Sequence, residues 1–225
     1  MQVTLYSAPA PVPLAGEVER YTGERYNHAM KKTLIFDLSD TLIEGLSHFT
    51  EVLSTRLNLA TSDVIPGLGG EPLVALTEGR IPEATYWQCV LERTHWPVTM
   101  PELRAGVRHT FRKPMPGMPE LLMSLRRHRL VLFSDQAREW WEDIEANHTF
   151  IHVFDQRFLS FDLGQTKRHV GTFQRVLAEL GAVPQNCVFI DDLSWNVERA
   201  ERVGLRSHRF TSTAALRACL PQEGI

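Results

Sequence analysis

Four short stretches of the sequence carry acidic, hydroxyl and ammonium side chains that in combination could handle a phosphate group. They are Asp37–Thr41, Ser134–Asp135, Lys167 and Asp191–Asn196. Three of the four follow short apolar runs, which are typical of buried strands. Open α/β sheets bind their ligands at the carboxyl ends of the strands. We therefore expect the four stretches to meet at one edge of a sheet.

Three carboxylates in these stretches would form a cluster that is unfavourable without a cation. Asp191 and Asp192 are adjacent, and Asp37 comes from another strand. Carboxylates at close range raise each other's pKa. A Mg²⁺ ion would offset their repulsion, because it binds a few carboxylates and retains several of its waters. The Lys167 ammonium and the Ser134 hydroxyl could then hold a phosphate dianion, and a carboxylate could attack phosphorus to give an acyl phosphate. The residues thus indicate magnesium-assisted phosphoryl transfer.

The apolar pattern indicates which elements must position these side chains. The expected strands are Thr33–Leu38, Leu130–Phe133, His152–Phe154 and Val188–Ile190. Helical patterns lie at Pro119–Arg129 and His169–Leu180, and Gly181 is expected to end the second helix. Strands that alternate with helices predict an α/β fold, here a doubly wound, Rossmann-like parallel sheet.

Residues 46–113 break this alternation and are expected to form an inserted α-helical cap. Their helical patterns cover Phe49–Leu59, Glu71–Thr77, Glu83–Arg93 and Pro101–Phe111. Gly67–Gly70 is interpreted as a hinge or loop. The core is expected to comprise residues 30–45 and 114–225. Residues 1–29, which combine prolines with a polar stretch, are predicted to be a disordered or loosely packed extension.

The composition excludes several classes of protein. The 225 residues are 43% hydrophobic and 23% charged, as in an ordinary globular domain. Because the sequence has 24 Lys and Arg residues and 27 Asp and Glu residues, it has no excess of positive charge that would attract nucleic acid. The sequence contains no run of about 18 apolar residues, the length that a membrane-spanning helix needs. The three cysteines share no motif spacing, so we expect reduced thiols in a cytoplasmic protein, either a monomer or a homodimer.

The ordered motifs resemble the haloacid dehalogenase (HAD) superfamily over about residues 33–210. They are Asp37-x-x-x-Thr41-Leu42, Ser134, Lys167 and Asp191-Asp192-x-x-x-Asn196. Finer features resemble the helical-cap branch that contains sugar-phosphate phosphatases, including the α-glucose-1-phosphate type. These features are Gly79–Ile81, Tyr86–Trp87, Leu159–Gly164 and the Asp-Asp-x-x-x-Asn ending. The resemblance implies a hydrolase that uses Mg²⁺ on a small phosphorylated metabolite.

The resemblance also implies a role for each matching residue. Asp37 would be the nucleophile that becomes phosphorylated, and Ser134 and Lys167 would bind the phosphate. Asp192 would bind the metal directly, whereas Asp191 and Asn196 match neighbours that either ligate it or orient its waters. The expected metal ligands are Asp37, Ser39 through its backbone carbonyl, Asp191 and Asp192. The expected phosphate-contacting residues are Ser39, Asp40, Ser134, Asp135, Lys167 and Asn196.

Several residues depart from the family pattern. Ser39 stands where most family phosphatases carry an acidic residue for general acid and base catalysis, which is typically worth ~10²–10⁴-fold, so slow turnover is expected. Asp40 is a candidate substitute, although an adjacent strand residue would point to the other face. Asp135 adds a negative charge where Asn is common. Arg168 replaces a Pro; it could compensate that charge electrostatically, but it is expected to lie in solvent.

Two other functions stay open at this point. A haloacid dehalogenase would use the same attacking Asp37 without a metal, although the pair Asp191–Asp192 argues against it. A phosphometabolite-binding or regulatory protein of low activity would keep the site without turnover, and Ser39 leaves that function open. The aromatic pairs Tyr86–Trp87 and Trp140–Trp141 are interpreted as core residues rather than as a sugar pocket.

Overall fold

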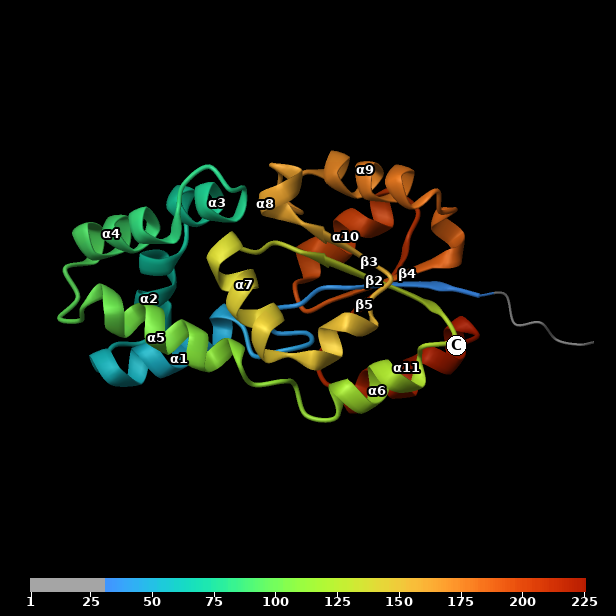
Figure 1. Ribbon diagram of the computed structural model, residues 1–225, viewed down its shortest axis with the longest axis horizontal. Coiled ribbons are helices and arrows are strands. Elements are labelled where there is room, and N and C mark those ends of the chain that lie inside the picture. Colours follow the sequence, from blue (N-terminus) through green and yellow to red (C-terminus); the bar gives the residue numbers. More distant parts are fainter. Residues whose placement is uncertain (1–30) are drawn as a thin grey trace, which may run out of the picture.

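A parallel sheet organises residues 31–225, which are the residues that the computed structural model describes. Its five strands in these residues are arranged in the order β3-β2-β1-β4-β5. They are β1 (Thr33–Phe36), β2 (Arg129–Ser134), β3 (Gln156–Leu159), β4 (Cys187–Asp191) and β5 (Arg206–Arg209). Helices cover both faces of the sheet (Figure 1). The predicted α/β class with a doubly wound parallel sheet is confirmed.

The register of the three central strands brings their carboxyl ends to one edge. Phe36 of β1 lies opposite Leu132 of β2 and Ile190 of β4. The next residues of all three strands therefore emerge together, and these include Asp37 and Asp191. The edge predicted to carry the chemistry is thus set by strand pairing alone.

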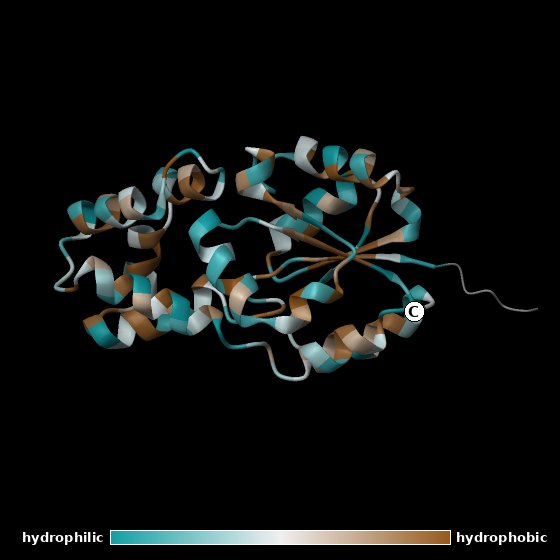
Figure 2. Ribbon diagram, in the orientation of Figure 1, coloured by the Kyte–Doolittle hydropathy of each residue, from teal (hydrophilic) through white to brown (hydrophobic). Residues whose placement is uncertain are grey.

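Alternate strand residues pack against helices on opposite faces of the sheet. Leu34 and Phe36 share an apolar cluster with one group of helices, whereas Ile35 belongs to a second cluster. The first group contains α6 (Met118–Ser124), α7 (Arg138–Asn147), η1 (Thr149–Val153) and α11 (Thr213–Cys219). The second contains α9 (Val170–Leu180) and α10 (Ser194–Arg202). Figure 2 shows the resulting concentration of apolar residues along the strands.

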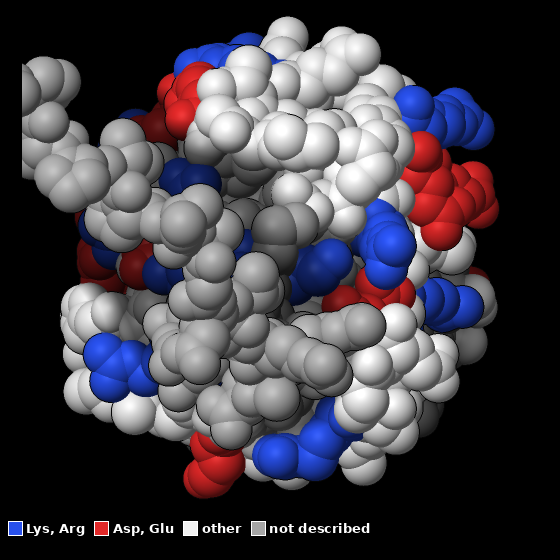
Figure 3. Space-filling model, turned by 90° about the vertical axis from the view of Figure 1, so that its right-hand side faces the viewer, with Lys and Arg blue, Asp and Glu red and all other residues white. Residues whose placement is uncertain are grey.

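Shorter helical turns join these elements and end the chain. They are α8 (Ser160–Leu163), η2 (Pro184–Asn186) and η3 (Leu220–Glu223). Gly181 ends α9 in the left-handed conformation (φ 58°), as predicted. On the face opposite to the cap, Lys and Arg side chains are interspersed with Asp and Glu side chains (Figure 3). Among the described residues, no helix has the length and apolar character needed to cross a membrane.

The cap consists of helices inserted between β1 and β2. They are α1 (Leu46–Leu57), α2 (Thr61–Leu68), α3 (Glu71–Thr77), α4 (Glu83–Thr94) and α5 (Met100–Phe111). A Thr99–Glu102 capping box starts α5, which explains its sharp beginning. The expected inserted helical cap is therefore present, and its exact limits stay a prediction. Helix α2 was not predicted because it contains Pro66 and Gly67, so part of the expected loop Gly67–Gly70 is helical.

One strand prediction was wrong and one strand was missed, both at the sheet edges. His152–Phe154 lies at the end of the 3₁₀ helix η1, and the neighbouring strand is the less apolar β3. The strand β5 (Arg-Ser-His-Arg) was missed because it contains no apolar residue. Both edge strands contain exposed or partly exposed residues, so they do not need the continuous apolar run of a central strand buried on both faces. The predicted extension, residues 1–29, lies outside the described residues.

Two contacts fix the end of α3 against the core helix α8. The Ser160 hydroxyl of α8 donates a hydrogen bond to the Thr77 carbonyl oxygen at 2.5 Å. Just beyond α3, Gly79 has a φ of +71°, and a Cβ atom there would lie 2.8 Å from the Phe161 carbonyl oxygen. Position 79 therefore requires glycine both for its backbone conformation and for the close approach of the segments that contain Gly79 and Phe161.

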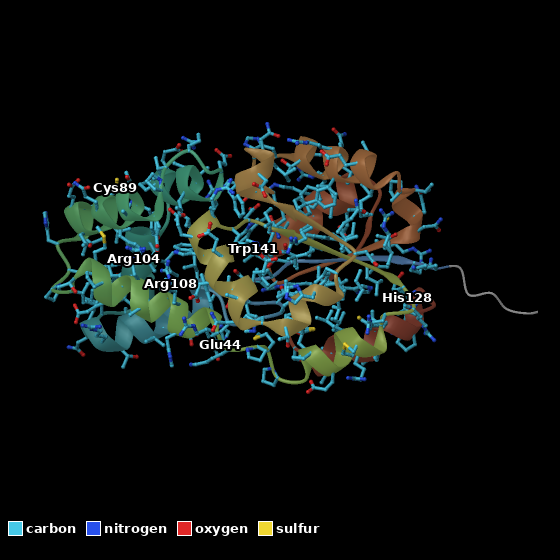
Figure 4. The ribbon with its side chains drawn as sticks, in the orientation of Figure 1. Glu44, Cys89, Arg104, Arg108, His128 and Trp141 are labelled. Carbon is cyan, nitrogen blue, oxygen red and sulfur yellow. The ribbon has the colours of Figure 1, made fainter. Side chains whose placement is uncertain are left out.

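A second attachment links the cap to α7 through a buried acid. Glu83 at the start of α4 is 1% exposed and accepts hydrogen bonds from the indoles of Trp87 (3.0 Å) and Trp140 (2.9 Å). Arg108 binds both Glu83 carboxylate oxygens, and Arg104 contacts one of them at 3.0 Å; both arginines belong to α5 (Figure 4). Burial alone would raise the pKa of Glu83, but the hydrogen bonds from Arg108 and the two indoles lower it below its usual value.

We predict that Gly79→Ala destabilises the fold more than Gly164→Ala does. Both glycines have positive φ angles, but a Cβ at Gly164 meets nothing within 4 Å. Left-handed backbone costs an alanine ~1–2 kcal/mol at either position. The clash with Phe161 should bring the total loss for Gly79→Ala to roughly 2–4 kcal/mol, which at roughly 2–4 °C per kcal/mol is visible in thermal melting. Equal melting temperatures for the two variants would contradict the close packing of α3 on α8.

Candidate active site

The carboxyl edge of the sheet gathers three carboxylates around one buried ammonium. Lys167 Nζ lies 2.5 Å from Asp37 Oδ1 and 2.6 Å from Asp191 Oδ2. Lys167 is 1% exposed, and Asp37 is 6% exposed. One oxygen each of Asp37, Asp191 and Asp192 lie within 4.8 Å of one another. Residues from three distant parts of the sequence thus converge at this edge.

Backbone pairing holds each of these groups in place. The Asp37 amide donates to the Ile190 carbonyl oxygen at 2.9 Å, which extends the pairing of β1 with β4 past the last strand residue. Asp191 is itself the last residue of β4. Lys167 arrives from the loop before α9, and the Asp135 carboxylate accepts its backbone amide at 2.9 and 3.1 Å. The strand pairing therefore fixes the positions of Asp37 and Asp191, and Asp135 fixes the position of the Lys167 backbone.

The local charges make this site suited to a divalent cation. Burial raises the pKa of Asp37, and the neighbouring Asp191 and Asp192 raise it further against the effect of Lys167. Burial, Asp191 and Asp40 raise the pKa of Asp192 to about 7. One ammonium therefore leaves part of the negative charge uncompensated, and the donor set consists of carboxylate oxygens, the ligands that Mg²⁺ prefers. The residues present thus fit a magnesium ion.

Asn196 and the following helix position the Asp191 carboxylate. Asn196 Nδ2 donates to both Asp191 oxygens at 3.1 Å, and the Leu193 amide donates to Oδ1 at 2.9 Å. With Lys167 on Oδ2, the two oxygens of this carboxylate accept four hydrogen bonds. A carboxylate has about four acceptor sites, so this group is saturated within the protein. Asp192 is only partly buried and lines the cavity.

Three buried hydroxyls at or near this edge have no hydrogen-bond partner in the described residues. They belong to Thr41, Ser134 and Thr166. Ser134 is 0% exposed and is the last residue of β2, the strand that pairs with β1, but it is not among the residues that line the cavity. Buried polar groups are normally hydrogen-bonded, so an unpartnered hydroxyl at a functional edge suits a bound polar ligand. Thr166 lines the cavity and was missed by the sequence analysis, although its position beside Lys167 was a signal.

Ser39 and Asp40 lie at the mouth of the site, but Asp40 does not follow the strand alternation expected for it. Its backbone is left-handed (φ 58°), because the chain has already left β1. The Asp40 carboxylate lines the cavity and accepts the amides of Gly45 (2.8 Å) and Ser47 (3.0 Å), with His48 Nδ1 at 2.6 Å. The expectation that strand geometry would turn Asp40 to the other face was therefore wrong.

Ser39, Asp135 and Arg168 surround the same cavity in different ways. The Gln136 side-chain amide donates to the Ser39 hydroxyl at 3.4 Å. Burial raises the pKa of Asp135 to about 6, against the opposing charge of Lys167. Arg168 is exposed as expected, yet it also lines the cavity. The family departures noted in the sequence are thus all part of the cavity wall.

A cavity of about 280 Å³ adjoins the acidic cluster. The core contributes Asp37, Asp192 and Lys167, and the cap contributes Leu46, Leu73, Val74, Thr77 and Phe111. The four aromatic residues interpreted as core are buried, as predicted. Trp140 nevertheless lines the cavity as well. The cavity therefore lies between the sheet edge and the cap.

Comparisons with known proteins agree with this architecture. Residues 31–204 match the haloacid dehalogenase-like hydrolase family. A HAD-family enzyme of Bacteroides thetaiotaomicron, solved with magnesium and inorganic phosphate, is 20% identical with a TM-score of 0.63, covering 82% of this chain and 96% of that one. A predicted HAD-like hydrolase of Porphyromonas gingivalis is 21% identical with a TM-score of 0.67, covering 85% and 98%.

A dehalogenase shares the fold as well. The L-2-haloacid dehalogenase of Xanthobacter autotrophicus, solved with covalently bound chloropropionic acid, is 17% identical with a TM-score of 0.62, covering 86% of this chain and 83% of that one. At these identities the structural likeness establishes a common fold. Because the family match spans most of the sequence, this chain belongs to the haloacid dehalogenase-like hydrolases.

Proposed function

We propose that the protein is a Mg²⁺-dependent phosphatase that hydrolyses a small phosphomonoester through a phospho-aspartate at Asp37. The observation that carries the proposal is the grouping of three carboxylates around the single ammonium of Lys167. Such a site combines a nucleophile, ligands for a hard cation and a positive charge for a phosphate. In this proposal the substrate is a small phosphorylated metabolite, and the enzyme is a cytoplasmic monomer or homodimer.

Asp37 would act as the attacking group in the first step. Lys167 holds its Oδ1 at 2.5 Å and so fixes the direction of the carboxylate. A bond forms between an Asp37 oxygen and phosphorus while the bond from phosphorus to the ester oxygen breaks, and the released alcohol takes up a proton. Water then attacks the phosphorus, which releases inorganic phosphate and restores Asp37. Two easier steps replace one difficult hydrolysis.

Asp37 and Asp192 would hold the ion directly, with Ser39 as a carbonyl ligand and Asp191 completing the negative charge of the site. Bound Mg²⁺ would neutralise charge that develops on the phosphoryl oxygens. Ser134 and Lys167 are the proposed phosphate-binding side chains. The unpartnered Ser134 hydroxyl supports this role, since it has no other polar partner in the described residues.

The remaining candidates for phosphate contact would act mainly by holding the loops that surround the proposed phosphate site. Asp40 holds the turn at Gly45 and Ser47, and Asp135 holds the Lys167 backbone. Asn196 orients Asp191. Ser39 supplies no acidic proton at neutral pH, so turnover should be slow for poor leaving groups. If turnover were very slow, the protein would act as a phosphometabolite-binding protein of low activity.

Dehalogenation is the second candidate function, favoured by the shared fold of the Xanthobacter enzyme. It would use the same attacking carboxylate to displace a halide. The partly uncompensated acids Asp37, Asp191 and Asp192 favour the phosphatase, because a metal-free site gains nothing from this excess charge. Assays of p-nitrophenyl phosphate and 2-chloropropionate with Mg²⁺ and with EDTA separate the two functions.

We predict that Asp37→Asn lowers phosphatase kcat by at least about a thousandfold, because an amide cannot serve as the nucleophile. Phosphate release from p-nitrophenyl phosphate with Mg²⁺ measures it. The variant should melt at or above the temperature of the metal-free parent, since it removes one of the crowded buried acids. Retained turnover in a folded variant would refute the phospho-aspartate proposal.

We predict that Mg²⁺ at a hundredfold excess over its Kd stabilises the protein by about 2.7 kcal/mol, a rise of about 5–10 °C in melting temperature. Asp192→Asn should lose most of that rise because it removes a proposed ligand. Asp63→Asn on the exposed side of α2 makes the same chemical change away from the site and should keep the full rise. An equal rise in both variants would place the metal elsewhere.

We predict a pH-dependent gain for Asp135→Asn, which still offers the Lys167 amide an acceptor. Above its pKa of about 6 the Asp135 carboxylate is ionised and repels a phosphate dianion. At pH 8 the variant should exceed the parent in kcat/KM by roughly three- to tenfold, corresponding to about 1 kcal/mol of repulsion. At pH 5 the ratio should approach one, since Asp135 is then protonated. A ratio independent of pH would contradict this.

A further inference from the structure

The walls of the cavity differ sharply in polarity between the phosphate end and the cap end. The acids, Lys167 and the unpartnered Thr166 hydroxyl lie at the phosphate end. The cap end presents the apolar side chains of Leu46, Leu73, Val74 and Phe111. A substrate whose phosphate occupies the first end must place its alcohol portion against the second.

The polar atoms near the apolar end are already engaged within the protein. The Trp140 indole N–H donates to Glu83 behind the wall at 2.9 Å, so the cavity meets the ring of this residue. The Thr77 hydroxyl donates to the carbonyl oxygens of Leu73 (2.9 Å) and Val74 (3.2 Å) within its own helix. These groups therefore offer little hydrogen bonding to a ligand.

The Gln136 amide is also engaged on both sides. Its Nε2 donates to the Ser39 hydroxyl at 3.4 Å, and its Oε1 accepts the Ala137 amide at 3.1 Å. At the outer part of the cavity, the polar side chains of Ser47 and Arg168 have no hydrogen-bond partner in the described residues, and both are exposed to solvent. The exposed indole of Trp195 (52%) extends the apolar surface to the mouth.

We propose, on the basis of the phosphatase function above, that the alcohol portion of the substrate is apolar and packs against Leu73, Val74, Phe111 and Trp140. A sugar would bury several hydroxyls against this wall, where those hydroxyls would lose their hydrogen bonds to water without replacement. An aromatic or branched aliphatic group gains from leaving water at the same surface. The proposal excludes sugar phosphates as the preferred substrates, although the sequence resemblance includes them.

The test compares benzyl phosphate with glucose 6-phosphate in the presence of Mg²⁺. Both are monoesters of primary alcohols, so their leaving groups differ mainly in polarity. We expect kcat/KM for benzyl phosphate to exceed that for glucose 6-phosphate by about tenfold or more. Equal values, or a preference for glucose 6-phosphate, would overturn the proposal.

Matched variants locate the selectivity in the cap. Val74→Thr keeps the volume of the side chain but adds a hydroxyl to the wall, and it should lower the ratio of the two kcat/KM values by about tenfold. Leu73→Asn provides a second polar change at the same wall, in case Val74→Thr unfolds. Val52→Thr on the solvent side of α1 (55% exposed) makes the same change outside the cavity and should leave the ratio unaltered. A ratio that moves no more in the wall variants than in Val52→Thr would overturn the assignment.

Acetyl phosphate separates a failure of this inference from a failure of the proposed function. Its small, reactive acyl group needs no apolar wall and no proton donor. If acetyl phosphate is hydrolysed no faster than by Asp37→Asn, the phosphatase proposal fails, and the substrate class fails with it. If it is hydrolysed rapidly while benzyl phosphate shows no advantage, only the substrate class is wrong.

Discussion

The buried ammonium of Lys167 between Asp37 and Asp191 is the interaction on which the site depends. It lets two carboxylates lie together in a region from which water is largely excluded, where unpaired charges would be very unfavourable. It does not compensate a third carboxylate, that of Asp192, and this residual charge gives the site its character. The parallel sheet supplies the acids at its edge, and Asp135 fixes the lysine that makes their proximity tolerable.

The parts that sequence could predict are those fixed by local pattern and strand pairing. Asp37 and Asp191 follow apolar central strands, so the edge where they meet was predictable. The edge strand β5 was not, since half-solvated strands carry no continuous apolar run. The orientation of Asp40 was equally inaccessible, because its carboxylate accepts hydrogen bonds from amides five and seven residues later in the chain. The phosphate-binding roles of Lys167 and Ser134 were inferred from the chemistry of their side chains, and the family resemblance implies the same roles.

The cap illustrates a different limit. Its helical patterns predict most of its helices, but not which side chains face the acids. That direction is decided by tertiary contacts: the Ser160–Thr77 hydrogen bond and the close approach at Gly79 set α3 against the core, which turns Leu73 and Val74 toward the cavity. The cap side of the cavity wall is therefore set by packing between segments distant in sequence, and helical periodicity carries no information on it.

The acid Glu83 has a further consequence for how enzymes of this shape can diversify. Its partners come from α4, α5 and α7, so one carboxylate belongs to both the insertion and the scaffold beneath it. Grafting a foreign insertion onto this scaffold would strand the Trp140 indole without an acceptor, and moving this insertion elsewhere would remove the one hydrogen bond that the Glu83 side chain accepts from α7. Recombination between relatives must therefore transfer α7 together with the inserted helices, which makes them one heritable module despite their separation along the chain.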